Sequence, residues 1–270
     1  MDIAYIIALI MFGIMGGFIS GLLGVGGGIV FVPVLMWAVT ALGITEAEHT
    51  QYVLANSFAA TFFAGAISSY KQFKLNSFYP KQIALTAMLA VPSSLLMTYI
   101  IRSGNWYSRE RFAGIFIALL IFMLIRFLVI KPSARQEINA TKNYKYPLTG
   151  FFTGIVSALS GLGGGIIMVP ILNQYMRLDI RKAAAISIGV IPMMMIPLIG
   201  YYGAVKPEQT IMSTQLGYLL PSVFLPMVAG LLFAAPLGVV FAQKWSAKRL
   251  KIIFASLIVV VILKTIISVL

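Results

Sequence analysis

The chain of 270 residues contains no cysteine, and this absence removes several classes of protein. Without thiols there can be no disulfide scaffold, no thiolate zinc site and no cysteine nucleophile. The 24 glycines and 12 prolines follow no G-X-Y period, which excludes a collagen-like chain.

Charge is also scarce. Only 10% of the residues are charged, against about 25% in soluble domains, while 60% are hydrophobic. So few charges cannot cover a water-facing surface, and a disordered chain has the opposite composition. The composition predicts an all-α polytopic integral membrane protein with little mass outside the lipid bilayer. The net charge of +13 is scattered over short loops, as in cytoplasmic loops of membrane proteins, and no nucleic-acid partner is expected.

Acidic residues are missing from the predicted membrane spans. All seven lie near termini or in loops: Asp2, Glu46, Glu48, Glu110, Glu137, Asp179 and Glu208. We therefore expect no carboxylate relay for protons, no cation site, no metal site and no cofactor. The single histidine, His49, is expected in a solvated outer loop beside Glu48, with a pH-sensing role as the alternative.

Apolar runs long enough to cross a bilayer, about 20 residues each, recur along the chain. The expected runs are 3–39, 51–70, 82–101, 112–130, 146–176, 183–203, 214–243 and 250–270. The polar stretch 131–145 falls at the middle of the chain. It predicts a cytoplasmic linker between a first transmembrane repeat, 1–130, and a second, 146–270.

The two halves share a motif at an offset of 137 residues. Nine residues of 17–35 recur unchanged in 154–172: Gly17, Ser20, Gly24, Gly26, Gly27, Gly28, Val32, Pro33 and Leu35 match Gly154, Ser157, Gly161, Gly163, Gly164, Gly165, Val169, Pro170 and Leu172. The agreement indicates an internal duplication. Because glycine clusters interrupt helices, each half should open with a broken helix, either a kinked full span or a re-entrant pair of short helices.

The basic residues favour the re-entrant arrangement. If both broken helices return to their starting side, one side collects fourteen Lys and Arg: Lys71, Lys74, Lys81, Lys131, Arg135, Lys142, Lys145, Arg177, Arg181, Lys182, Lys244, Lys248, Arg249 and Lys251. The other side keeps four: Arg102, Arg109, Arg111 and Lys206. The richer side is then cytoplasmic, both termini lie outside, and the two repeats are inverted. Each repeat would hold one glycine-broken helix and three transmembrane helices.

The glycine breaks are the candidate site. A helix that begins after each break would direct free N–H groups and a positive dipole end at an anion. The alternative is that the glycines only allow close helix packing, as the spacings Gly13/Gly17, Gly17/Gly21 and Gly150/Gly154 also suggest. Neither cluster continues as a nucleotide-binding loop.

Polar side chains near the breaks could complete an anion shell. Ser57, Thr61 and Ser68 share one helical face, which should point into protein or a cavity. Interhelical hydrogen bonding is the alternative role for this face. Arg126 and Lys264 lie inside apolar runs but close enough to span ends to reach water. The predicted substrate-binding residues are Gly26, Gly27, Gly28, Gly163, Gly164, Gly165, Ser20, Asn56, Ser57, Ser157 and Ser187.

The twin motifs GLLGVGGGIVFVPVL and SALSGLGGGIIMVPIL resemble those of the TauE/SafE sulfite exporter family. The resemblance covers nearly the whole chain, and it implies transport of sulfite, sulfoacetate or related organosulfonates across the bacterial cytoplasmic membrane. The glycine breaks and the prolines after them match the family pattern. The polar residues of 56–69 do not come from it.

These observations lead to one functional hypothesis with two alternatives. The chain is predicted to be a secondary transporter, not an enzyme, that moves a small anion by alternating access. The alternatives are a passive anion channel and a membrane-embedded partner subunit without transport of its own. The expected partners are the anionic substrate and the lipid bilayer, and a homo-oligomer is left open.

Overall fold

The computed structural model describes residues 3–104, 106–129, 143–211 and 213–246, and near the C-terminus residues 252, 255–256, 258–263 and 265. Its helices are α1 (Ile3–Leu23), α2 (Gly28–Ala41), α3 (Glu46–Lys74), α4 (Pro80–Ser103), α5 (Arg109–Val129), α6 (Lys145–Ser160), α7 (Gly165–Pro170), the π-helical turn η1 (Ile171–Tyr175), α8 (Ile180–Ala204) and α9 (Pro221–Lys244). Positions 131–142 of the expected linker lie outside the described residues.

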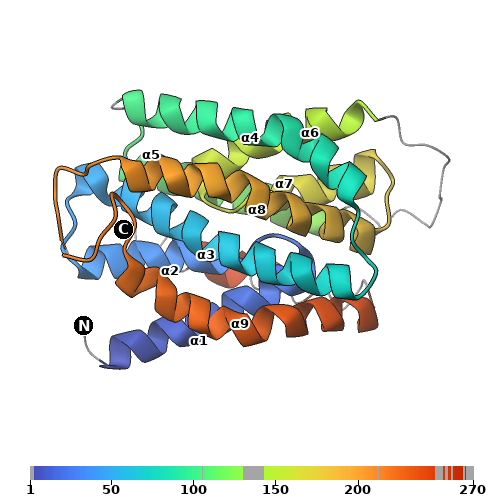
Figure 1. Cartoon of the computed structure of the whole chain (residues 1–270), viewed down its shortest axis with the longest axis horizontal. Helices are drawn as coiled ribbons and strands as arrows, with labels where there is room; N and C mark the ends of the chain where they lie inside the picture. Colours follow the sequence, from blue (N-terminus) through green and yellow to red (C-terminus); the bar gives the residue numbers. More distant parts are fainter. Residues whose placement is uncertain are drawn as a thin grey trace.

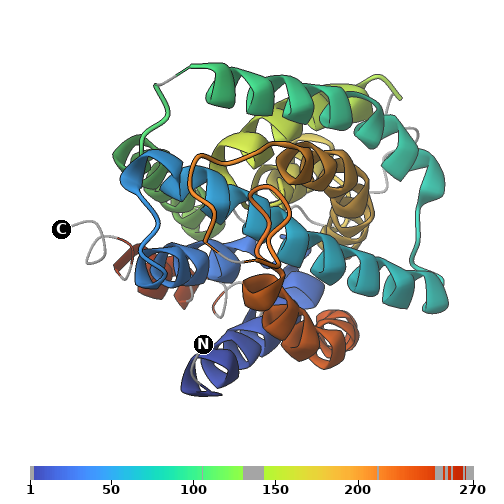
Figure 2. The ribbon, with the colours of Figure 1, turned by 60° about the vertical axis from the view of Figure 1, so that its left-hand side comes forward.

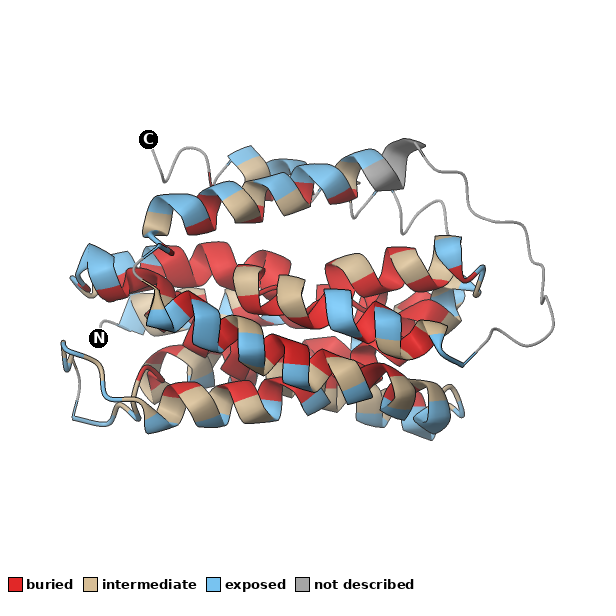
Figure 3. Cartoon of the chain, turned by 90° about the horizontal axis from the view of Figure 1, so that it is seen from above, coloured by how far each residue is buried: buried red, intermediate tan, exposed pale blue. Residues whose placement is uncertain are grey.

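The helices run side by side in three layers (Figure 1). One outer layer contains α4 and α6, the other contains α1 and α9, and α3 and α8 lie between them. The middle pair is the most enclosed, because 72% of the apolar window of α3 and 67% of that of α8 are buried, against 39–50% for α1, α4 and α9. Figure 3 shows this buried interior. These five helices are long and apolar enough to cross a bilayer, which confirms the all-α polytopic membrane fold.

Both glycine-interrupted runs are helical hairpins that turn back on themselves. Near the start of α1, the Tyr5 ring lies 5.3 Å from that of Trp37, close to the end of α2. In the second hairpin, the Lys145 Nζ atom at the start of α6 lies 5.0 Å from the Tyr175 ring at the end of η1. Neither run therefore crosses the molecule, and the two hairpins enter from opposite ends (Figure 1).

Glycines outside the breaks bring helix backbones together. A Cβ atom added at Gly13 would lie 2.1 Å from the Met227 carbonyl oxygen of α9, and one at Gly150 would lie 2.0 Å from that of Thr86 in α4. A Cβ atom at Gly21 or Gly154 would lie 2.1 Å, and one at Gly17 2.6 Å, from an atom of the same neighbouring helix. The packing interpretation is thus confirmed for these glycines, which join α1 to α9 and α6 to α4.

The two ends of the molecule differ in their loops and charges. We call the end that holds loops 42–45, 104–108 and 205–220 the loop end, and the end that holds loops 75–79 and 176–179 the basic end (Figure 1). The basic end has, among the described residues, Lys71, Lys74, Lys81, Lys145, Arg177, Arg181, Lys182 and Lys244; the loop end has Arg102, Arg109, Arg111 and Lys206. This distribution follows the re-entrant arrangement expected from the sequence.

Two helix starts differ from the expected boundaries by more than four residues. The third helix, α3, begins at Glu46 and not at 51, with Glu46 and Glu48 in its first turn and Lys71 and Lys74 in its last, where these charges favour the helix dipole. The helix expected from 214 begins only at Pro221, because the described residues between α8 and α9, 205–211 and 213–220, are not helical. Proline suits the first turn of a helix, since its missing N–H would have no intrahelical partner there.

Candidate functional site

The glycine clusters adopt the same backbone conformation in both halves. Gly24, Gly26 and Gly27 have φ of 75°, 84° and 74°, and their counterparts Gly161, Gly163 and Gly164 have 70°, 74° and 76°. This left-handed region is accessible to glycine but strained for other residues. It ends α1 and α6 and reverses the chain, so that α2 and α7 begin immediately after Gly27 and Gly164.

The two breaks lie against each other at the centre of the molecule. A Cβ atom at Gly28 would be 2.6 Å from the Leu162 Cα, and one at Gly165 would be 2.4 Å from the Gly24 carbonyl oxygen. Each break also accepts a serine hydroxyl from a middle-layer helix. Ser57 Oγ of α3 donates to the Gly161 carbonyl at 2.7 Å, and Ser187 Oγ of α8 donates to the Gly24 carbonyl at 2.8 Å.

The breaks leave hydrogen-bond donors without use. The first intrahelical bond of α2 runs from the Val30 N–H to the Gly27 carbonyl at 2.9 Å, and that of α7 from Ile167 to Gly164 at 3.2 Å. The N–H groups that precede Val30 and Ile167 have no carbonyl acceptor within their own helix, as at any helix N-terminus. Four hydroxyls on the surrounding helices are fully buried and find no hydrogen-bond partner among the described residues: Ser20, Ser157, Thr61 and Thr153.

The predicted site residues therefore fall into two groups. Ten of them meet at the breaks: the six glycines 26–28 and 163–165, together with Ser20, Ser57, Ser157 and Ser187. Asn56 points elsewhere, because its amide nitrogen donates to the Tyr52 and Tyr218 carbonyls at 2.8 and 3.0 Å, and its oxygen accepts from the Leu220 N–H at 2.8 Å. The buried face of Ser57, Thr61 and Ser68 is confirmed, since none of the three is exposed.

One face of α3 fastens the 205–220 loop across the loop end. Glu48 accepts hydrogen bonds from the Glu208 and Gln209 N–H groups, both at 2.9 Å, and from the Tyr218 hydroxyl at 2.7 Å. One turn further, the Tyr52 hydroxyl donates to the Gln209 carbonyl at 2.6 Å, and Asn56 follows after another turn. Figure 2, which brings this end forward, shows the loop running over the bundle. Burial and the Glu48 carboxylate raise the pKa of the Tyr218 hydroxyl, which keeps it a donor.

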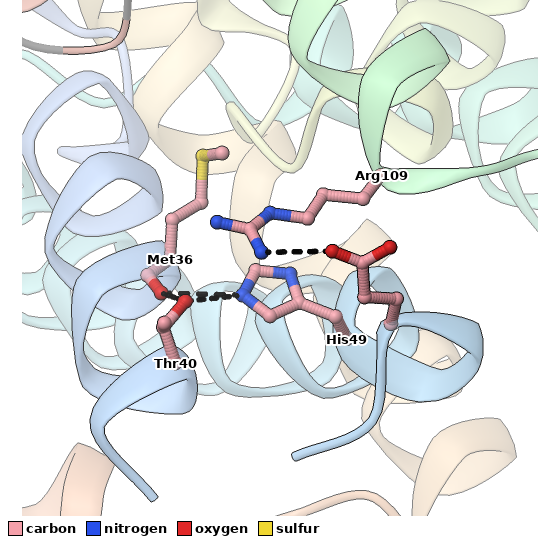
Figure 4. Close-up of polar contacts among 5 residues, drawn as sticks. Met36, Thr40, His49 and Arg109 are labelled. Atoms are coloured by element: carbon pink, nitrogen blue, oxygen red, sulfur yellow. Dashed lines mark hydrogen bonds and ion pairs between the residues drawn. The ribbon is translucent and has the colours of Figure 1, made fainter. Parts of the chain in front are cut away.

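The expectation of a solvated loop for Glu48 and His49 is wrong. The side chains are 5% and 1% exposed, because α3 starts early enough to include both and turns them towards its neighbours. His49 Nε2 lies 3.2 Å from the Met36 carbonyl and 3.0 Å from Thr40 Oγ1 (Figure 4). Arg109 of α5 extends past the ring to a 3.6 Å ion pair with Glu46.

The side chain of Arg126 and all of Lys264 lie outside the described residues.

Comparisons with known proteins agree with the fold. The family model "Sulfite exporter TauE/SafE" matches residues 9–265. A probable membrane transporter protein of Methanocaldococcus jannaschii is 27% identical, over 93% of this chain and 91% of its own length. Probable membrane transporter proteins of Haemophilus influenzae and Bacillus subtilis are 26% and 25% identical; the matches cover 95% and 94% of this chain, and 96% and 95% of theirs. No solved structure matches significantly.

Proposed function

The chain belongs to the sulfite exporter TauE/SafE family, and from this premise we propose which substrate it moves and how. As a member it is a multi-pass membrane transporter and not an enzyme. The proposed substrate is a small, sulfur-containing anion such as sulfite, sulfoacetate or a related organosulfonate. The proposed mechanism is secondary transport by alternating access, in which the centre opens to one side of the membrane at a time.

The observation that carries the proposal is the meeting of the two breaks. Helices α2 and α7–η1 begin at the breaks. The last bonds before the breaks run from the Gly24 and Gly161 N–H groups to the carbonyls of Ser20 and Ser157, whose buried hydroxyls have no described partner. The acidic residues in the described part lie at helix ends or in the 205–220 loop: Glu46, Glu48, Glu110, Asp179 and Glu208. A helix N-terminus favours an anion by roughly 0.3–1 kcal/mol, and by up to about 2 when partly buried. The centre therefore suits a negative ligand.

Orientation completes the proposal. We assign the basic end to the cytoplasm of a bacterial cell and the loop end, with both termini, to the outside of the cytoplasmic membrane. In this arrangement 1–130 and 146–270 are inverted repeats that meet at the breaks. Because the native chain has no cysteine, a single cysteine at Ala47 or at Lys74 reports the orientation. A membrane-impermeant thiol reagent should label the first in intact cells and spare the second; the opposite pattern would reverse the assignment.

The deciding experiment is anion flux in proteoliposomes that contain the purified protein. Ser57→Asp places a fixed negative charge beside the breaks and should abolish flux of sulfite and sulfoacetate. Ser57→Ala removes one hydrogen bond and should weaken transport only modestly, by about 0.5–1.5 kcal/mol. Undiminished flux in the aspartate variant, or transport of a cation by the native protein, would contradict the anion site.

The same proteoliposomes separate the alternatives. A secondary transporter concentrates the anion when a proton gradient is applied, whereas a passive channel only equilibrates it. A partner subunit without transport of its own gives no flux when reconstituted alone.

A further inference from the structure

Thr61 lies where α3 passes both glycine breaks. It is one helical turn beyond Ser57, and its side chain is fully buried. A Cβ atom added at Gly26 would come 3.0 Å from the Thr61 methyl carbon, and one at Gly163 would come 2.7 Å from the same carbon. One methyl group is thus in contact distance of both breaks, and the hydroxyl is bonded to the same Cβ atom as this methyl group.

The Thr61 hydroxyl has no hydrogen-bond partner among the described residues. Threonines in helices commonly satisfy this group on the carbonyl four residues earlier. Four threonines among the described residues do so at 2.8–2.9 Å: Thr40, Thr86, Thr149 and Thr265. For Thr61 that acceptor would be the Ser57 carbonyl, and the bond is not made. A buried hydroxyl without a partner destabilises the protein, so a ligand that accepts a hydrogen bond from it would remove the penalty.

The equivalent position in the second half carries no hydroxyl. Ser57 corresponds to Ser187 at an offset of 130, so Thr61 corresponds to Ile191. A Cβ atom at Gly26 would also lie 3.0 Å from the Ile191 Cδ1 atom. The breaks are therefore flanked by a hydroxyl-bearing side chain on α3 and by an alkyl side chain on α8.

We infer that Thr61 determines substrate specificity: its hydroxyl donates a hydrogen bond to an oxygen of the transported anion where the two breaks meet. Ile191 opposite offers no donor, so the oxygen-bearing part of the anion faces α3. The inference rests on the proposed anion transport and adds the group that orients the substrate.

The test compares Thr61→Val with Thr61→Ser in the full-length protein. Valine keeps the shape and removes the hydroxyl, while serine keeps the hydroxyl and removes the methyl group. The probes are sulfite and sulfoacetate, with dissociation constants from titration of the purified protein and thermal unfolding measured without anion. Ile191→Val is the matched control, since it trims the opposite wall without touching a polar group.

We expect Thr61→Val to weaken binding of both probes about tenfold or more, at an unchanged or higher unfolding temperature. Thr61→Ser and Ile191→Val should bind within about threefold of the native protein. Native-like binding by Thr61→Val would overturn the inference while leaving anion transport intact, and equal losses in the valine and serine variants would assign the effect to packing and overturn it too. If the native protein binds no anion, the proposed function itself fails, and the inference with it.

Discussion

The two glycine breaks share a backbone but not their surroundings. Both reverse the chain through three glycines with left-handed backbone conformation. In both, a glycine carbonyl oxygen accepts a hydrogen bond from a serine hydroxyl. Their walls differ. Gly16 packs near Gly27 where Thr153 packs near Gly164, and α2 is a regular helix of 14 residues where α7 ends after 6 and continues as a π-helical turn. The residues that the two halves share are the ones that reverse the chain. In the proposed transporter, the side chains that differ between the halves are the ones that can distinguish one substrate from another.

The connections that follow α3 and α8 differ as well. Residues 75–79 join α3 to α4 by a short turn at the basic end, while 205–220 join α8 to α9 at the loop end. Among the described residues, the longer connection is held by hydrogen bonds to three residues spaced one turn apart on α3: Glu48, Tyr52 and Asn56. We call these three residues the polar ladder. If the protein opens at the loop end, either these hydrogen bonds break or the 205–220 loop moves together with α3. Opening at the basic end requires neither.

Alanine substitutions in the two breaks should differ most in how much unfolding free energy they cost. At Gly24 a Cβ atom would lie 2.7 Å from the Ala184 backbone, whereas at Gly161 it would first meet a Val32 methyl group at 3.1 Å. A left-handed alanine costs about 1–2 kcal/mol at either position, and overpacking adds about 1–3 at Gly24. We expect Gly24→Ala to lose about 2–5 kcal/mol and Gly161→Ala about 1–2, measured by thermal unfolding of the purified protein.

Gly43→Ala is the matched control for this pair. Gly43 has φ of 70° but no atom within 4 Å of the added Cβ position, so it measures the backbone cost alone. Equal losses at Gly24 and Gly43 would show that contact between the breaks and α8 adds nothing to stability.

The breaks could be predicted from sequence because the left-handed conformation needs glycine itself, and glycine is visible in a sequence. The same holds for the packing glycines of α1 and α6, whose spacing of four residues follows the helix period. Pro221 is a suitable first residue of a helix, and it does begin α9. The predicted span starts earlier, at 214, because residues 214–220 are apolar enough to extend it.

The polar ladder and His49 could not be predicted in the same way. Glu48 and His49 look like loop residues, because charged and polar side chains surround them in the sequence. Their burial depends on partners that are distant in sequence, such as the Gln209 N–H, 161 residues away. Asn56 was predicted with Ser57 as a substrate-binding residue, but adjacent residues on a helix point about 100° apart, and Asn56 bonds to the residues before α9.

The second prediction tests the ladder on α3. Glu48→Gln replaces an acceptor-only carboxylate with an amide whose NH₂ group faces the donors of Glu208, Gln209 or Tyr218. Hydrogen bonds to charged groups contribute about 1.5–3 kcal/mol, so the 205–220 loop should open that much more easily. Hydrogen–deuterium exchange of the loop amides measures this as roughly ten- to hundredfold faster exchange.

Glu46→Gln provides the comparison on the same turn of α3. The Glu46 side chain is 86% exposed, and its single ion pair with Arg109 should contribute less than about 1 kcal/mol. Faster exchange of the loop in Glu46→Gln than in Glu48→Gln would contradict the ladder.

The smallest effect concerns the feature that the two breaks share most closely. Ser57→Ala and Ser187→Ala each remove a hydroxyl that donates a hydrogen bond to a carbonyl oxygen of the opposite half. The two hydrogen bonds have nearly equal lengths of 2.7 and 2.8 Å. Each should cost about 0.5–1.5 kcal/mol of unfolding free energy, and the two costs should agree, because each leaves one buried carbonyl without its donor. Ser94→Ala is the control, since Ser94 donates only within its own helix, to the Val91 carbonyl. If Ser57→Ala and Ser187→Ala cost no more than this control, the serine bonds do not hold the breaks together. If only one of the two variants costs more than the control, the two halves differ in their backbone contacts and not only in the side chains around them.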